Sequence, residues 1–144
     1  MTIRRKARED ALKILYQLDI SDNFKLPIDL ESFEYIFSNN KTSLSKDFTI
    51  EIVKGVLQHS DFIDKIISKS SLKWKLDRLL LIDRNILRIA VYEIWFLPEI
   101  PSAVSINEAI EISKKYTSED SPKFINGVLN NIKEEFEKYE KNPV

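Results

Sequence analysis

The chain of 144 residues has no cysteine, one histidine and two glycines. Without cysteine it can form no disulfide, thiolate zinc site, iron–sulfur cluster or cysteine nucleophile. The single histidine, His59, cannot build a multi-histidine metal site. Two glycines, at positions 55 and 127, form neither a Rossmann fingerprint nor a Walker-type phosphate cradle, and their scarcity disfavours an all-β fold with its many turns. We therefore expect no metal, no cofactor and no enzyme of these classes.

Long apolar runs are also missing. No stretch of 18 apolar residues exists, so no segment is expected to span a membrane. Arg8, Glu9 and Asp10 occupy the place where a signal peptide has its apolar segment. The hydrophobic content of 43% is enough for a packed core, and the length fits one domain over residues 1–144. These features predict a single-domain cytoplasmic protein.

Charge is balanced overall but not along the chain. The 22 basic and 23 acidic side chains give a net charge of −1. Residues 1–16 carry five basic against two acidic side chains, a net +3, whereas residues 20–40 carry one against four, a net −3. This asymmetry indicates an anionic partner at the N-terminal end.

Hydrophobic periodicity predicts an all-α fold. Isoleucine is abundant and favours strands by propensity, but the apolar residues recur at spacings of three or four rather than two. His59–Ser60 marks a kink or a break, and Ser105 with Glu108 reads as a capping box that opens a helix. The expected helices cover residues 3–19, 30–37, 48–57, 62–67, 82–96, 105–116 and 122–139, with 71–81 irregular or a short turn.

The helix expected at 82–96 is apolar nearly all round, which is typical of a central buried element. Glu93 falls inside its apolar arc, and a buried carboxylate must be paired, so we predict an internal salt bridge. Arg84 and Arg88 lie on one side of the helix. They are either a binding face or one half of such bridges.

Both glycines lie inside helical patterns, Gly55 in Val-Lys-Gly-Val-Leu and Gly127 in Ile-Asn-Gly-Val-Leu. A glycine in a helix interior costs about 1 kcal/mol relative to alanine. We interpret both as positions where two helices come into close contact.

The clearest functional signal lies in the first helix. Arg4 and Arg8 project on the same side as Leu12 and Leu15, so this face changes from apolar to basic toward the N-terminus. Positive charge there opposes the helix dipole, and an anionic ligand would compensate for it. Arginine binds phosphate bidentately and stacks on bases. The pattern favours nucleic-acid binding, with a solvated helix end as the alternative.

A second candidate lies at the start of the last helix. Phe124 stands at the margin of the apolar stripe, beside Lys123. An aromatic ring and a lysine at a helix N-terminus can stack a base and hold a phosphate. The alternative is that Phe124 forms an edge of the core.

Several motifs, taken in their order, resemble the NusB family. The opening Arg4-Arg5-Lys6-Ala7-Arg8-Glu9, with Ala11-Leu12 and Leu15-Tyr16, is similar to the family's arginine-rich N-terminus. The central motifs are Leu76-Asp77-Arg78, Asp83-Arg84, Ile86-Leu87-Arg88 and Tyr92-Glu93. The C-terminal motifs are Ile106-Asn107-Glu108-Ala109, Glu119-Asp120-Ser121 and Lys123-Phe124-Ile125-Asn126-Gly127-Val128-Leu129. Residues 20–45 match nothing in the family pattern, and Pro122 departs from it.

The resemblance implies two small helical bundles packed together, about seven helices, and no enzymatic activity. It implies binding of single-stranded boxA RNA in ribosomal RNA leaders, jointly with the ribosomal small-subunit protein that acts as NusE. This complex joins the RNA polymerase elongation complex with other Nus factors and suppresses premature termination. The RNA-binding residues would be Arg4, Arg5, Lys6, Arg8, Lys123 and Phe124, and the partner would dock near Arg84 and Arg88.

Two other interpretations remain open. NusB-like domains also form the N-terminal part of some ribosomal RNA cytosine methyltransferases, and this chain, which has no catalytic cysteine, would be a detached module of that kind. The other is a protein-binding helical adaptor whose basic end only solubilises it. RNA affinity with and without the ribosomal partner separates the three.

Overall fold

The computed structural model describes residues 2–37, 43–71 and 78–141. Within these ranges the chain is all-α, and no helix is long and apolar enough to cross a bilayer. Leu76 and Asp77 of the central motif lie outside the described residues. The helices are α1 (Ile3–Ile20), η1 (Leu30–Phe33, a 3-10 helix), α2 (Glu34–Phe37), α3 (Ser43–Gln58), α4 (Ser60–Ser70), α5 (Leu81–Phe96), α6 (Ser102–Tyr116) and α7 (Ser121–Lys141).

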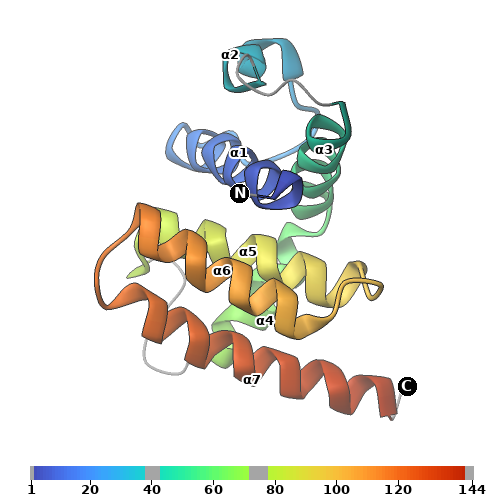
Figure 1. The fold of residues 1–144 in the computed structure, drawn as a ribbon, viewed down its shortest axis with the longest axis vertical. Coiled ribbons are helices and arrows are strands. Elements are labelled where there is room, and N and C mark those ends of the chain that lie inside the picture. Colours follow the sequence, from blue (N-terminus) through green and yellow to red (C-terminus); the bar gives the residue numbers. More distant parts are fainter. Residues whose placement is uncertain (1, 38–42, 72–77, 142–144) are drawn as a thin grey trace.

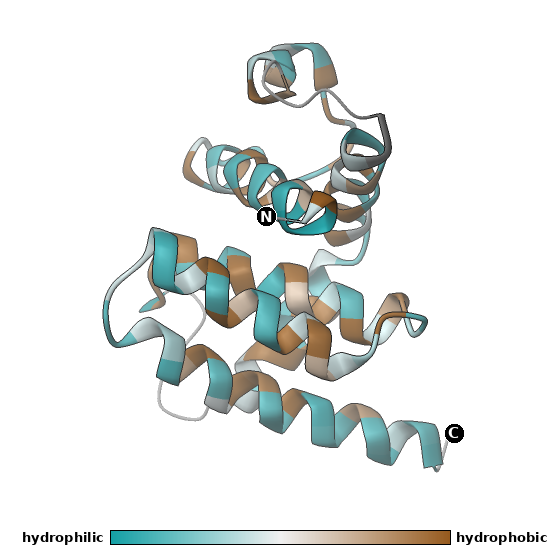
Figure 2. Cartoon of the chain, in the orientation of Figure 1, coloured by the Kyte–Doolittle hydropathy of each residue, from teal (hydrophilic) through white to brown (hydrophobic). Residues whose placement is uncertain are grey.

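The helices form two groups, as the family resemblance implies. Figure 1 shows α1, α2 and α3 together in one group, and α4 to α7 in the other. The helix α5 packs against α1, α3, α4, α6 and α7, so it links the groups. Its unbroken run of buried residues from Asn85 to Ile94 explains why its sequence is apolar nearly all round. The outer helices bury one apolar stripe and leave a hydrophilic face, which is visible along α7 in Figure 2.

Two boundaries refine the sequence-based expectations. The sequence left open whether the helix kinks or ends at His59–Ser60. In the structure α3 ends at Gln58, and His59 is the N-cap residue of the separate helix α4. The helix α6 begins at Ser102, directly after Pro101, so the prediction of a capping box at Ser105 and Glu108 is wrong. Both residues lie inside the helix, where they bind side chains of α5 and α1 instead.

The two glycines differ in their surroundings. At Gly55 an added Cβ would lie only 2.2 Å from the ring of Tyr92, so the predicted close helix contact is confirmed. At Gly127 an added Cβ would meet no atom within 4 Å, and the residue is exposed on α7. The same prediction is therefore wrong for Gly127, and packing does not account for a glycine there.

Candidate nucleic-acid interface

The first turn of α1 presents Arg4 to solvent. Thr2 caps the helix by accepting a hydrogen bond from the amide of Arg5 at 3.0 Å. Arg4 is exposed, and its guanidinium lies 4.9 Å from the centre of the Phe48 ring of α3. Lys6 is 30% exposed and pairs with Asp10 of the next turn at 3.2 Å. This turn therefore offers Arg4, supported by an aromatic ring, and a half-buried lysine.

Arg5 is turned toward α6. Its Nε and Nη2 donate to the two carboxylate oxygens of Glu108 at 3.1 and 2.5 Å, which is the bidentate geometry of a strong ion pair. The Arg5 side chain is 31% exposed. It fixes the start of α1 on α6 and still reaches solvent.

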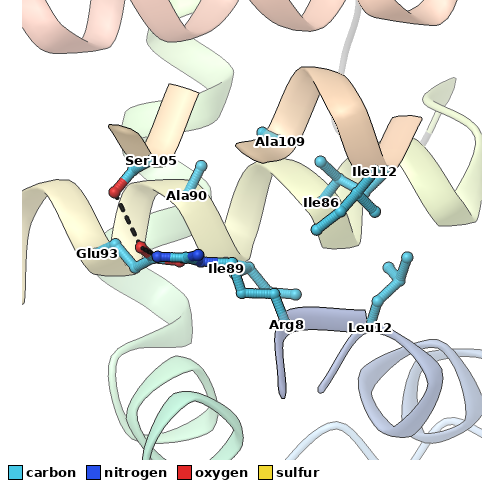
Figure 3. A pocket seen from close by; sticks show the side chains of 9 residues that line it. All are labelled: Arg8, Leu12, Ile86, Ile89, Ala90, Glu93, Ser105, Ala109 and Ile112. Carbon is cyan, nitrogen blue, oxygen red and sulfur yellow. Dashed lines mark hydrogen bonds and ion pairs between the residues drawn. The ribbon is translucent and has the colours of Figure 1, made fainter. Parts of the chain in front are cut away.

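Arg8 lies inside the molecule. Figure 3 shows its side chain reaching from α1 toward Glu93 of α5. Its Nε and Nη2 each donate to Glu93 of α5 at 2.7 Å, and its Nη1 donates to Glu108 at 3.3 Å. Ser105 completes the cluster by donating to Glu93 at 2.9 Å. The predicted internal salt bridge of Glu93 is thereby confirmed.

The side chain of Arg8 is 4% exposed, and residues 7–10 are all buried. The prediction that Arg8 contacts an RNA backbone is therefore corrected, because its guanidinium is committed to two carboxylates. Periodicity placed Arg8 on the correct face of α1. It did not show that α5 and α6 already cover this face at Arg8, one turn nearer the N-terminus than Leu12. A cavity of about 10 Å³ beside this cluster holds at most one water molecule, so it is no site for a small ligand.

Glu108 makes stability depend on pH. Hydrogen bonds from Arg5 hold its pKa below the ordinary 4.5, assisted by the nearby charges of Arg5 and Arg8 and opposed by burial. A carboxyl whose folded pKa is lowered stabilises the fold above its unfolded pKa, and this stability is lost as pH falls through the folded pKa.

We expect the free energy of unfolding to fall as the solution is taken from about pH 7 to about pH 3. Glu108→Gln should lose part of this dependence because it removes one titrating group. Denaturant titrations at each pH measure both proteins, and identical pH profiles would contradict the assignment.

Arg84 and Arg88 are halves of internal salt bridges. Arg84 donates to both carboxylate oxygens of Asp19 at 2.7 and 2.5 Å. Arg88 binds Asp64 of α4 at 2.8 and 3.0 Å and Asp19 at 2.9 Å, and its side chain is 6% exposed. Of the two interpretations left open by the sequence, the structural one holds. These guanidinium groups join α1, α4 and α5, and the expectation that a partner docks near them stays a prediction.

The start of α7 forms the second candidate site. Lys123 is exposed and Phe124 is half-buried. The turn before them is held by buried Asp83, which accepts hydrogen bonds from Thr117 and Ser121 at 2.8 Å each. Beside Phe124 lies an open cavity of about 320 Å³, which falls in the size range of small-ligand sites. Its lining comprises Arg78, Leu79, Leu80, Asp83, Ser118, Asp120, Ser121 and Phe124.

The two candidate sites are separate. Arg5 binds Glu108 in the first half of α6, whereas Lys123 follows the end of that helix. The rise of an α-helix puts Glu108 and Tyr116 about 12 Å apart. Between them Lys115 is 51% exposed and pairs with Glu9 of α1 at 2.9 Å.

Comparisons with known proteins find the same family at the level of sequence and of structure. The family model described as the NusB family matches residues 5–134. The transcription antitermination protein NusB of Bacillus subtilis (strain 168) is 45% identical over 134 residues, which are 93% of this chain and 97% of that protein.

Solved structures give the same result. A structure of T. maritima NusB has a TM-score of 0.83 and 38% identity, and the match covers 97% of this chain and 99% of the other. A structure of the antitermination factors NusB and NusE in complex with dsRNA matches with a TM-score of 0.81 and 30% identity, over 94% of this chain and 98% of the other.

Proposed function

The chain belongs to the NusB family, and from this membership we propose that it is a transcription antitermination factor. It binds single-stranded boxA-type RNA of ribosomal RNA leaders together with the ribosomal small-subunit protein that acts as NusE. With other Nus factors this complex joins the elongating RNA polymerase. The observation that carries the proposal is the likeness, over 94% of the chain, to a solved complex of NusB and NusE with dsRNA, which supports binding of RNA and of NusE.

The proposed role is binding without catalysis, by one RNA-binding domain over residues 1–144. Because bacterial transcription takes place in the cytoplasm, we place the protein there. The resemblance to antitermination proteins of similar length favours this role over that of a methyltransferase module.

We propose that RNA contacts the protein at Arg4, Lys6, Lys123 and Phe124. The exposed Arg4 and Lys123 supply charge for phosphates, and the half-buried Phe124 supplies a ring beside a cavity large enough for a base. Arg5 and Arg8 act differently. Their ion pairs with Glu108 and Glu93 position the first turn of α1, with Arg5 partly exposed at the edge of the surface.

Three substitutions test this surface. Phe124→Ala should weaken RNA binding by about 1–3 kcal/mol, the range for a base stacked on an aromatic ring. Its cost in stability should stay below the roughly 3–5 kcal/mol of a fully buried phenylalanine. Arg4→Ala and Lys123→Ala should each flatten the logarithmic salt dependence of single-strand binding by about 0.7.

Fluorescence anisotropy with a labelled boxA-type RNA at several salt concentrations gives these values. Lys65→Ala, which removes an exposed lysine of α4, is the matched control and should leave the slope unchanged. An unchanged salt dependence in the Arg4 and Lys123 variants would show that RNA binds elsewhere.

A further inference from the structure

Gly127 has no structural reason to be a glycine. It lies in the interior of α7, is exposed, and has open space where a Cβ would project. Its backbone is ordinary helix, since the described residues include no glycine with positive φ. Glycine weakens a helix at such a position. What the missing side chain provides is close access to the helix backbone from outside.

The residues around Gly127 are uncharged amides. Asn126, Asn130 and Asn131 are all exposed on the same stretch of α7. The Nδ2 of Asn130 donates to the Oδ1 and to the backbone carbonyl of Asn126, at 2.8 Å each. This pairing holds the two side chains in place. Asparagine carries both a donor and an acceptor, which is the combination that base edges and the 2′-hydroxyl recognise.

This face continues directly from the candidate site at the start of α7. Lys123 precedes Gly127 by four residues, so both lie on one side of the helix, and Phe124 is three residues away. The stretch ends where Glu134 and Glu135, both exposed, bring negative charge to the surface. From Lys123 to Asn131 it extends about 12 Å.

We propose that the exposed face of α7 from Lys123 to Asn131, here named the amide face, carries RNA onward from Phe124. The RNA chain passes close over Gly127, while the side chains of Asn126, Asn130 and Asn131 hydrogen-bond its bases and ribose hydroxyls. The negative charges of Glu134 and Glu135 repel phosphate, so the RNA leaves the surface of α7 before it reaches them. This inference rests on the proposed function and adds residues that read the RNA sequence rather than its charge.

The composition of the face favours RNA over a protein partner. The cores of protein interfaces are rich in aromatic and other apolar side chains. On the amide face Phe124 is the aromatic residue, at one end, and the exposed residues beyond it are polar or glycine. Amides beside a lysine and an aromatic ring suit a single strand, whose bases and sugars are both accessible.

Gly127→Leu tests the close approach. Leucine is a good helix former and enters open space, so thermal stability should be unchanged or rise. Affinity for a labelled boxA-type oligonucleotide should fall about tenfold or more, comparable to losing one base contact. Gly127→Ala should also leave thermal stability unchanged or higher and lower the affinity for RNA, but by a smaller factor. Ser68→Leu places the same side chain at an exposed position of α4 and should leave affinity unchanged.

Asn126→Ala combined with Asn130→Ala tests the reading of sequence. This variant should bind boxA-type and scrambled RNA with more similar affinities, while its salt dependence stays that of the unsubstituted protein because no charge is lost.

The outcomes separate this inference from the proposed function. If Phe124→Ala weakens RNA binding and Gly127→Leu does not, RNA does not cross the amide face and the inference is overturned. If Gly127→Leu binds RNA normally but no longer binds the ribosomal partner protein, the amide face is a protein-binding surface, and the inference is again overturned. Failure of the unsubstituted protein to bind RNA, alone or with the partner, would refute the proposed function itself.

Discussion

Arg8→Ala should lower the free energy of unfolding by about 3–5 kcal/mol, the usual cost of removing one partner of a buried ion pair. The variant leaves Glu93 with a carboxylate that is 1% exposed and has lost both guanidinium hydrogen bonds. Ser105 remains as a donor, but one hydroxyl cannot replace a bidentate cation. Denaturant titration measures the loss.

Two variants show whether the loss of stability comes from the buried carboxylate of Glu93, which loses its cationic partner in Arg8→Ala. Arg4→Ala removes an arginine one turn earlier, at an exposed position, and should change stability by less than about 0.5 kcal/mol. Arg8→Met combined with Glu93→Leu replaces the pair by apolar side chains and should recover most of the stability. A loss below about 1 kcal/mol in Arg8→Ala would contradict the role assigned to this pair.

This pair matters for function because of its position. Glu93 belongs to the central helix α5, and Glu108 belongs to α6. Through Arg5 and Arg8 these two carboxylates fix the start of α1, and with it the exposed guanidinium of Arg4. RNA binding should therefore fall in Arg8→Ala only to the extent that α1 loosens. The salt dependence of RNA binding by the folded protein should not change.

Much of the fold follows from spacing alone. The apolar stripes of α1 and α7 can be read in the sequence because burial on one side of a helix leaves a helical period. The helix α5 can be read because burial on nearly all sides makes it apolar nearly all round. The internal salt bridge of Glu93 also followed, since a carboxylate among apolar neighbours needs a partner. The partner itself, Arg8, is 85 residues away in the chain and has no local signature.

The errors have the same physical origin. Ser105 and Glu108 have the spacing of a capping box, but their side chains are used by α5 and α1, and local spacing does not reveal such tertiary contacts. Gly127 has the same sequence setting as Gly55, and only the position of neighbouring helices separates them. The cavity beside Phe124 likewise depends on where the segment before α5 meets the start of α7.

The second large effect is coupling between RNA and the partner protein. The contacts proposed here for phosphates give affinity with little sequence information. A second subunit that extends the surface supplies more base contacts, so the partner should tighten RNA binding. Since linkage is reciprocal, RNA must tighten partner binding by the same factor, typically about 5–150-fold.

The most direct test of the account is a pair of RNA titrations at one fixed salt concentration, with and without saturating amounts of the ribosomal partner protein. Labelled boxA-type RNA and a scrambled RNA of the same length and composition are compared. The partner should strengthen binding of the boxA-type RNA by about 5–150-fold and binding of the scrambled RNA much less. Equal boxA-type affinities with and without the partner would contradict it, because the chain would then recognise its RNA alone.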